Sequence, residues 1–268
     1  RKRSPIDFMS FDLAEISRRP YQVLSTLYHL SRFFLQNATF DDFNPQKFTL
    51  ETAFKNGKLQ AADLWLMSKL QEKIEEYTNK LESSEFNCAV AVLDDFVIET
   101  LSRLYVPMIR KELWTDEPET FERRQTIYAL LHHTLKTMTL LFNPITPYIS
   151  EALYQKVYRQ LEPNLPESVN LASWPLPNQQ MLNKALEEEF DILLKVVSIS
   201  YAARQQGKLK RRWPLAKAIV VAPEKTLQAL KNLESLFLEQ TNVKAAQFAV
   251  SVPEDVGGEN WVSSQEDT

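Results

Sequence analysis

A cluster of basic residues between Tyr201 and Lys217 is the part of this sequence whose residue types most directly suggest chemistry. The chain has a net charge of −4, yet this segment contains no Asp or Glu. Lysine and arginine side chains bind the phosphates of nucleic acids, whereas the alternative is a solvated basic loop. We predict RNA contacts for the following residues of this segment: Arg204, Lys208, Lys210, Arg211 and Arg212.

A second group of residues could follow a phosphate backbone along one helix. Arg103 and Arg110 are separated by about two helical turns and therefore share one face. Trp114 lies at the end of that face, where an aromatic ring can stack on an unpaired base. Alternatively, Arg103 pairs with a neighbouring carboxylate such as Asp94 or Glu99 inside the bundle, since a buried charge needs a partner.

No arrangement of catalytic residues accompanies these basic groups. The sequence has no glycine-rich phosphate loop and no nucleophile elbow. His132 and His133 are adjacent on a predicted helix and point about 100° apart, which is a poor geometry for a metal site. Cys88 is the only cysteine, and the glutamate run at 187–189 is typical of a solvated helix face. We expect no catalytic residue, metal or cofactor here; the alternative is an enzyme of unrecognised type.

The elements that carry these residues are predicted to be helices. Only four glycines occur, which leaves few of the tight turns that a many-stranded sheet requires. Apolar residues instead recur at steps of three and four. Their stripes cover residues 23–34, 64–81, 86–108 and 128–142. Thr146 and Pro147 predict the N-cap and first residue of a fifth helix, which ends near Leu161, and Glu151 favours this helix start electrostatically.

The C-terminal part of the chain changes character. A proline-rich loop is predicted over 162–177, and Trp174 is expected to pin it; a sixth helix follows and ends near Gly207. Two short apolar runs flank a helical stretch at 224–239 and predict a β-α-β piece. The fold class is therefore mainly α. Its predicted parts are a helical bundle (1–177), a long connecting helix with a small α/β subdomain (178–250) and a disordered acidic tail (251–268).

Composition also indicates the cellular location of the protein. The first residues carry charge without an apolar run long enough for a signal peptide, and no segment of membrane-spanning length is free of charges. A single cysteine fits a reducing compartment. We expect a cytoplasmic monomer without a membrane partner.

Several segments resemble the region that follows the nucleotide-binding fold of isoleucyl-tRNA synthetases, especially those of the archaeal and eukaryotic-type branch. The resemblance extends over most of the chain. The stretches that carry it are Arg32-Phe33-Phe34, residues 63–70, residues 101–105 with Arg110 and Trp114, residues 143–151, residues 167–175, Asn242-Val243-Lys244, and Arg204 followed by Gly207, Lys210, Arg212 and Trp213-Pro214-Leu215. Three positions depart from the family pattern: Asn170 stands where histidine is usual, Trp213 replaces a glutamine, and Thr241 replaces a leucine.

This resemblance implies the anticodon-binding helical bundle of a class I synthetase, whose partner is the anticodon arm of a tRNA. The parent protein would join isoleucine to its tRNA with ATP and Mg²⁺. The ATP-binding signatures of the family, His-x-Gly-His and Lys-Met-Ser-Lys-Ser, do not occur in this sequence. We therefore expect the catalytic and editing domains of the same polypeptide as further partners. Two alternatives stay open: the same domain of a valyl or leucyl enzyme, and a helical scaffold that binds proteins and no RNA.

Overall fold

The computed structural model describes residues 13–115, 117–253 and 261–264. The chain divides into two compact units, residues 1–182 and 183–268, which are described separately below. The charged N-terminal segment and most of the acidic tail, about which the sequence made predictions, lie outside the described residues.

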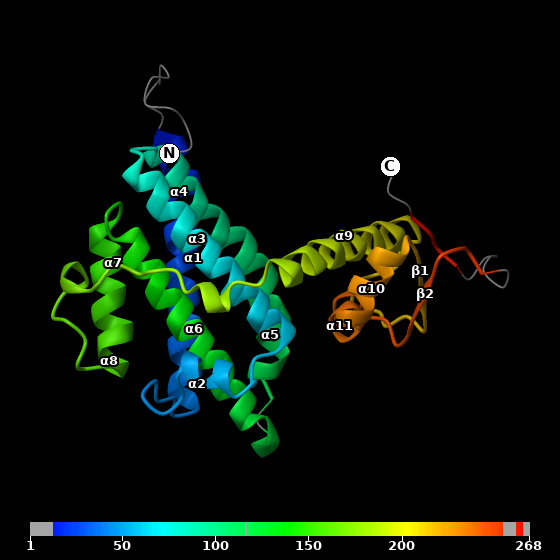
Figure 1. The fold of residues 1–268 in the computed structure, drawn as a ribbon, viewed down its shortest axis with the longest axis horizontal. Coiled ribbons are helices and arrows are strands. Elements are labelled where there is room, and N and C mark those ends of the chain that lie inside the picture. Colours follow the sequence, from blue (N-terminus) through cyan, green and yellow to red (C-terminus); the bar gives the residue numbers. More distant parts are fainter. Residues whose placement is uncertain (1–12, 116, 254–260, 265–268) are drawn as a thin grey trace. The chain divides into compact units, whose positions relative to one another are not determined.

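The first unit is a bundle of helices (Figure 1). Its elements are α1 (Leu13–Phe40), α2 (Leu50–Lys55), α3 (Ala61–Glu82), α4 (Phe86–Asp95), η1 (Phe96–Tyr105), α5 (Val106–Leu113), η2 (Pro118–Thr120), α6 (Phe121–Phe142), α7 (Pro147–Leu153), η3 (Tyr154–Tyr158), α8 (Arg159–Leu161), η4 (Val169–Leu171) and η5 (Gln179–Met181). Each of the four apolar stripes lies on a helix, as predicted. The short helix α2, capped by the Thr49 side chain, was not predicted because it is too short to show a period.

Large rings fill the core of this unit. Fully buried side chains include Phe34 of α1, Tyr77 of α3, Tyr105 of η1 and Tyr128 of α6. α1 packs on α6 and on η1, and α3 packs on α4 and α6. Because each buried ring removes a large apolar surface from water, these rings account for much of the packing energy that holds the helices together.

The predicted long third helix is present as the continuous run α4–η1–α5, but its middle is wound more widely than an α-helix. η1 is a π-helix, and the amide of Val106 donates to the carbonyl of Leu101, five residues back. Pro107 follows directly. Proline has no N–H to donate to a carbonyl of the preceding turn. The hydrogen bonds next to it can therefore shift from the i−4 to the i−5 carbonyl. Residue periodicity alone did not predict this change.

The proline-rich loop after α8 is pinned to the bundle. The indole N–H of Trp174 donates to Thr78 Oγ1 at 3.0 Å, and its ring stacks on Tyr77 with centroids 6.0 Å apart, which confirms the predicted role of this tryptophan. Glu151 accepts from Ser168 Oγ at 2.8 Å and from the amide of Val169 at 2.9 Å. Its carboxylate therefore holds this loop, a role that the sequence prediction missed.

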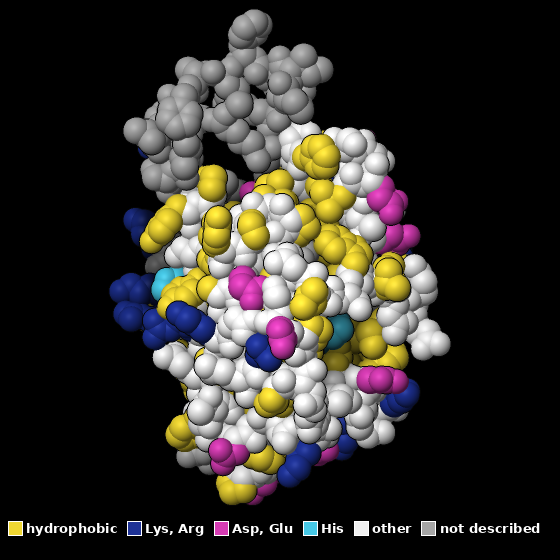
Figure 2. All heavy atoms as spheres, turned by 90° about the vertical axis from the view of Figure 1, so that its left-hand side faces the viewer, with side chains coloured by type: hydrophobic (Ala, Val, Ile, Leu, Met, Phe, Trp, Pro, Cys, Tyr) yellow, Lys and Arg dark blue, Asp and Glu magenta, His cyan; other side chains and the backbone are white. Residues whose placement is uncertain are grey.

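The start of the fifth helix follows the prediction in position but not in detail. α7 begins at Pro147 with Thr146 as its N-cap residue, yet the Thr146 hydroxyl donates back to the carbonyl of Phe142 instead of capping the helix. Figure 2 looks onto the side of Figure 1 where α7 lies and shows exposed hydrophobic side chains among scattered charges. Tyr148 of α7 and Leu171 of η4 are among the exposed apolar residues of the chain.

The second unit contains the predicted β-α-β piece. Its elements are α9 (Lys184–Gln206), β1 (Ala218–Val221), α10 (Glu224–Asn232), α11 (Glu234–Thr241) and β2 (Ala246–Ala249). The two strands are parallel, with Ala218 opposite Ala246 and Val221 opposite Ala249. Parallel neighbours need a helical crossover, which α10 and α11 provide. The stretch predicted as one helix is two, because the helix breaks at Leu233.

Gly207 ends α9, as predicted, although its backbone is not left-handed; Lys208 takes that conformation, with φ 53°. The reason for glycine is space, because an added Cβ would lie 2.3 Å from Val262 Cγ1. Within the described residues, no helix is both long enough and apolar enough to cross a membrane.

Candidate nucleic-acid interface

The predicted face of the third helix is exposed at the end of η1 and along α5. Arg103 donates to both carboxylate oxygens of Glu99, at 2.8 and 2.7 Å. The alternative of a carboxylate partner is therefore confirmed for Glu99, but the pair lies on the surface and not inside the bundle. Because exposed ion pairs contribute little to stability, Arg103 can exchange this carboxylate for a phosphate at low cost.

Trp114 is the aromatic end of this face. It is the C-cap residue of α5 and is 69% exposed. The guanidinium carbon of Arg110 lies 5.7 Å from the centroid of the Trp114 ring. An exposed ring with a cation already beside it presents a flat surface to an unpaired base and a charge to its phosphate.

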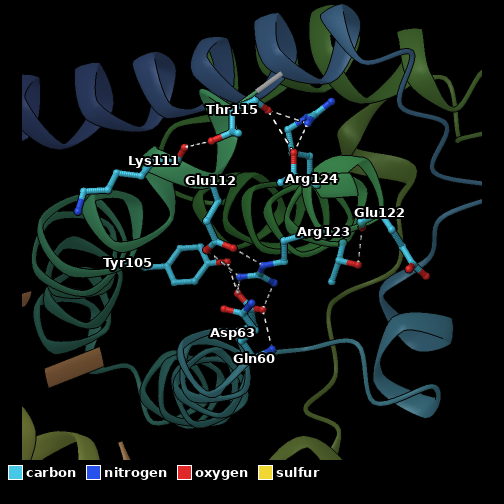
Figure 3. Close-up of polar contacts among 11 residues, drawn as sticks. Gln60, Asp63, Tyr105, Lys111, Glu112, Thr115, Glu122, Arg123 and Arg124 are labelled. Carbon is cyan, nitrogen blue, oxygen red and sulfur yellow. Dashed lines mark hydrogen bonds and ion pairs between the residues drawn. The ribbon is translucent and has the colours of Figure 1, made fainter. Parts of the chain in front are cut away.

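A buried ion network supports this end of the bundle (Figure 3). Asp63 of α3 is fully buried; it accepts from the hydroxyl of Tyr105 at 2.7 Å and is paired with Arg123 of α6. The same guanidinium donates to Glu112 of α5, from Nε at 2.6 Å and from Nη2 at 3.1 Å. Burial would lower the pKa of Arg123, but its bonds to Glu112 and Asp63 raise it above its usual value. The network therefore ties α3, η1, α5 and α6 together. Its member Glu112 lies two residues before Trp114.

A second network holds the segment that follows Trp114. Arg124 donates to Asp41 through Nε at 2.7 Å and Nη2 at 3.0 Å, and to the carbonyl of Thr115 through Nη1 at 2.7 Å. The Tyr128 hydroxyl also donates to Asp41, at 2.6 Å. Burial opposes ionisation of Asp41, but its bonds to Arg124 and Tyr128 lower its pKa overall. Neither network was predicted. The sequence signal was two adjacent arginines in the first turns of a helix that is largely buried, where cations need partners.

The predicted basic segment forms a surface loop in the second unit, with one exception. Lys208, Lys210, Arg211 and Arg212 are exposed, whereas Arg204 is only 2% exposed. The Arg204 guanidinium donates to four backbone carbonyls, which are those of Lys210 at 3.3 Å, Trp213 at 2.9 Å, Thr241 at 2.7 Å and Asn242 at 3.0 Å. Burial lowers the pKa of Arg204. Its donors face the chain itself, so the structure gives Arg204 the role of holding this loop against the end of α11.

Aromatic rings alternate with the cations of this loop. The guanidinium carbon of Arg211 lies 3.8 Å from the centroid of the Tyr201 ring, and the Lys210 ammonium lies 5.5 Å from that of Trp213. The Asn242 side chain, on a left-handed residue, donates to the carbonyl of Arg211 at 3.0 Å. Trp213 is exposed and Tyr201 is half-buried, and cations beside aromatic rings are typical of surfaces that bind single-stranded nucleic acid.

The structure thus brings the predicted residues into two groups. One group consists of Arg103, Arg110 and Trp114 on the third helix, and the other of Lys208, Lys210, Arg211 and Arg212 on the loop held by Arg204. They belong to different compact units. Among the described residues, no cluster of three or more His, Cys, Asp or Glu is arranged to hold a metal ion.

The adjacent histidines lie beside a pocket of about 330 Å³ in the first unit. His132 Nε2 is 3.1 Å from Glu162 Oε1, and the Lys136 ammonium is 2.6 Å from the same oxygen. Burial lowers the pKa of His132 and, with Lys136 nearby, lowers that of His133 to about 4. Burial opposes ionisation of Glu162, but its bonds to His132 and Lys136 lower its pKa to about 2. The site is therefore an ionised Glu162–Lys136 pair beside two neutral imidazoles.

We expect the first unit to lose stability as the pH falls. The unfolded chain binds a proton at His133 near pH 6.5 and the folded chain only near pH 4, so stability declines between these values. Glu162 adds a further loss from its ordinary pKa of 4.5 down to about 2. The urea midpoint should fall from pH 7.5 to pH 5, and His133→Gln should flatten this dependence. His29→Gln, at an exposed position, is the control and should not; a midpoint of the unaltered chain that is constant over this range would contradict the account.

Comparison with known proteins shows which family this chain is similar to. The model of the anticodon-binding domain of tRNA ligase matches residues 63–220, from α3 of the first unit through the basic loop and most of β1 in the second. The chain is also similar to isoleucine–tRNA ligases of archaea. It is 33% identical to that of Methanocella arvoryzae over 246 residues, which are 91% of this chain and 22% of that protein.

Two further relatives give the same picture. The chain is 29% identical to the isoleucine–tRNA ligase of Methanopyrus kandleri over 96% of its own length and 23% of that protein, and 31% identical to that of Pyrococcus furiosus over 85% and 20%. It therefore spans about a fifth of the length of the curated relatives it matches.

Proposed function

This chain belongs to the family of anticodon-binding domains of tRNA ligases, and on that premise we propose that it docks the anticodon arm of a tRNA. The observation that carries the proposal is the exposed Trp114 ring with Arg110 against it, at a helix end held by two buried ion networks. Recognition of unpaired bases needs a ring that stays in place when the base arrives. The networks supply this rigidity, so little ordering is required on binding.

In the proposed complex, Trp114 stacks on a splayed base of the anticodon loop. Arg103 releases Glu99 to bind a phosphate about three turns away along the same helix. The exposed loop residues Lys208, Lys210, Arg211 and Arg212 bind sugar–phosphate without reading sequence. Arg204 acts as a positioning residue, since its guanidinium is occupied by the carbonyls of the loop. This replaces the direct RNA contact predicted for it.

The tRNA is proposed to be the one for isoleucine, because the similar proteins named above are isoleucine–tRNA ligases. The whole protein would join isoleucine to that tRNA with ATP and Mg²⁺. Catalysis and editing would use other parts of the polypeptide, with no cofactor and no chemistry in the residues described here. A cytoplasmic location and a monomeric state complete the proposal.

Replacement of Trp114 with alanine tests the proposal. Loss of one stacked base typically costs about 1–3 kcal/mol of binding free energy. We expect that loss for a transcript with the isoleucine anticodon, measured by filter retention at several salt concentrations. The fold should be unaffected, because the ring is largely exposed.

Phe86→Ala is the matched control, since Phe86 is an exposed aromatic residue at the start of the same long helix. It should bind as the unaltered chain does. Transcripts with valine or leucine anticodons should bind more weakly than the isoleucine transcript. If the Trp114 variant binds with unchanged affinity, or if all three transcripts bind equally, the proposed reading of the anticodon is wrong.

A further inference from the structure

The solvent-facing side of α1 carries a group of residues that none of the contacts proposed above includes. We call Arg18, Tyr21, Tyr28, His29 and Arg32 the α1 stripe. At 3.6 residues per turn, these positions fall within an arc of about 100°. The opposite side of the helix is buried in the bundle, and its buried residues are Val23, Leu27, Leu30 and Phe34.

The α1 stripe combines exposed rings with cations. All of its residues are exposed, with Tyr21 at 68% and Tyr28 at 41%. The Arg32 guanidinium carbon lies 5.9 Å from the centroid of the Tyr28 ring. The His29 ring meets Tyr28 edge to face, with centroids 5.4 Å apart. The contacts of Tyr28 are thus with other residues of the stripe, and both tyrosine rings stay accessible to a partner.

Between Arg18 and Phe40, this side of α1 carries positive charge without acidic residues. From Arg18 to Phe40 the sequence contains no Asp or Glu, and among the residues that the structure describes, neither Arg18 nor Arg32 pairs with a carboxylate. The solvent side of α3 is the contrast, because its lysines are matched by Glu one turn on: Lys69 lies 3.3 Å from Glu72, and Lys73 lies 2.7 Å from Glu76. A helix that needs only to be soluble carries both signs of charge, whereas the α1 stripe has one sign and therefore fits an anionic partner.

We propose that the α1 stripe is an additional RNA-binding surface, separate from the two groups described above, on which the sugar–phosphate backbone of the bound tRNA lies. This rests on the proposed function. Arg18 and Arg32, about 21 Å apart along the helix axis, hold phosphates, and Tyr21 and Tyr28 between them pack on riboses or exposed bases. RNA fits better than an acidic protein surface because exposed rings lie between two cations along one line, and stacking rings together with cations are typical of surfaces that bind nucleic-acid strands. No residue of the stripe reads an anticodon base.

The test uses three variants of the full chain. The first is Arg18→Gln with Arg32→Gln, the second is Tyr21→Ser with Tyr28→Ser, and the control is Lys69→Gln with Lys73→Gln, which removes the same charge from α3. Binding of the isoleucine-anticodon transcript is measured from low to physiological salt. The arginine variant should bind on the order of tenfold more weakly, and the slope of log affinity against log salt should fall by about two. The tyrosine variant should lose about fivefold or more.

The control should retain both affinity and slope, because the α3 lysines lie outside the proposed surface. Preference for the isoleucine anticodon over the valine anticodon should be unchanged in the arginine and tyrosine variants. If these variants bind like the unaltered chain while glutamine at Lys208, Lys210, Arg211 and Arg212 abolishes binding, the stripe inference is wrong and the proposed function stands. If they lose anticodon preference, the stripe reads bases and its backbone role is wrong. If the unaltered chain binds no tRNA at any salt concentration, both proposals fail.

Discussion

Replacement of Asp63 with alanine is expected to lower the free energy of unfolding of the first unit by about 3–5 kcal/mol. Asp63 is fully buried, and its removal takes one of two carboxylate partners from the Arg123 guanidinium and the acceptor from the Tyr105 hydroxyl. An unpaired charge inside a protein costs far more than an unpaired charge at the surface. Urea unfolding followed by circular dichroism at 222 nm measures the loss.

Two matched variants separate the ion pair from general packing. Glu51→Ala removes one partner of an exposed pair with Lys55, and should change stability by less than about 0.5 kcal/mol. Asp63→Leu with Arg123→Met replaces the buried pair by apolar groups and should recover much of the loss. The Asp63 variant should also bind tRNA more weakly, because Glu112 and the end of α5 lose their anchor. A loss of stability below about 1 kcal/mol would show that this network does not hold the bundle.

Replacement of Arg204 with methionine is expected to destabilise the second unit by about 3 kcal/mol or more, since four backbone carbonyls lose a charged donor. It should also weaken tRNA binding strongly, although in our account Arg204 touches no RNA. The reason is that Lys210, Arg211 and Trp213 lose the loop geometry that brings them together. Arg204→Lys should be intermediate, because an ammonium has three donors and cannot reach all four carbonyls.

The comparison of stability with binding distinguishes the two roles of Arg204. Lys225→Met removes a largely exposed cation from the same unit and should leave both properties unchanged. If the methionine variant of Arg204 keeps its unfolding midpoint but loses affinity for tRNA, Arg204 contacts the RNA directly and its role as a positioning residue is wrong.

The long elements of this chain could be predicted because their signal is local. Apolar residues at steps of three and four specify a helix wherever one side of it is buried, and this pattern located α1, α3, the third helix and α6. The two strands were predictable from two short apolar runs that flank a helical stretch. The basic loop was visible as composition alone. α2 and the break at Leu233 were missed because a few residues carry too little periodicity.

The roles of individual polar residues were decided by tertiary structure. Three arginines on helices show this. Arg103 is exposed and pairs with Glu99 one turn away on the same helix. Arg204 donates to backbone carbonyls, and Arg123 pairs with carboxylates of two other helices. Burial and partners depend on segments distant in sequence, such as Asp63 for Arg123 at a separation of 60 residues. The helical class, the small α/β piece and the place of the basic cluster could all be predicted from local sequence patterns. Which cations face water and which hold the fold followed only once the helices had packed, because the cost of a buried charge is set by what surrounds it.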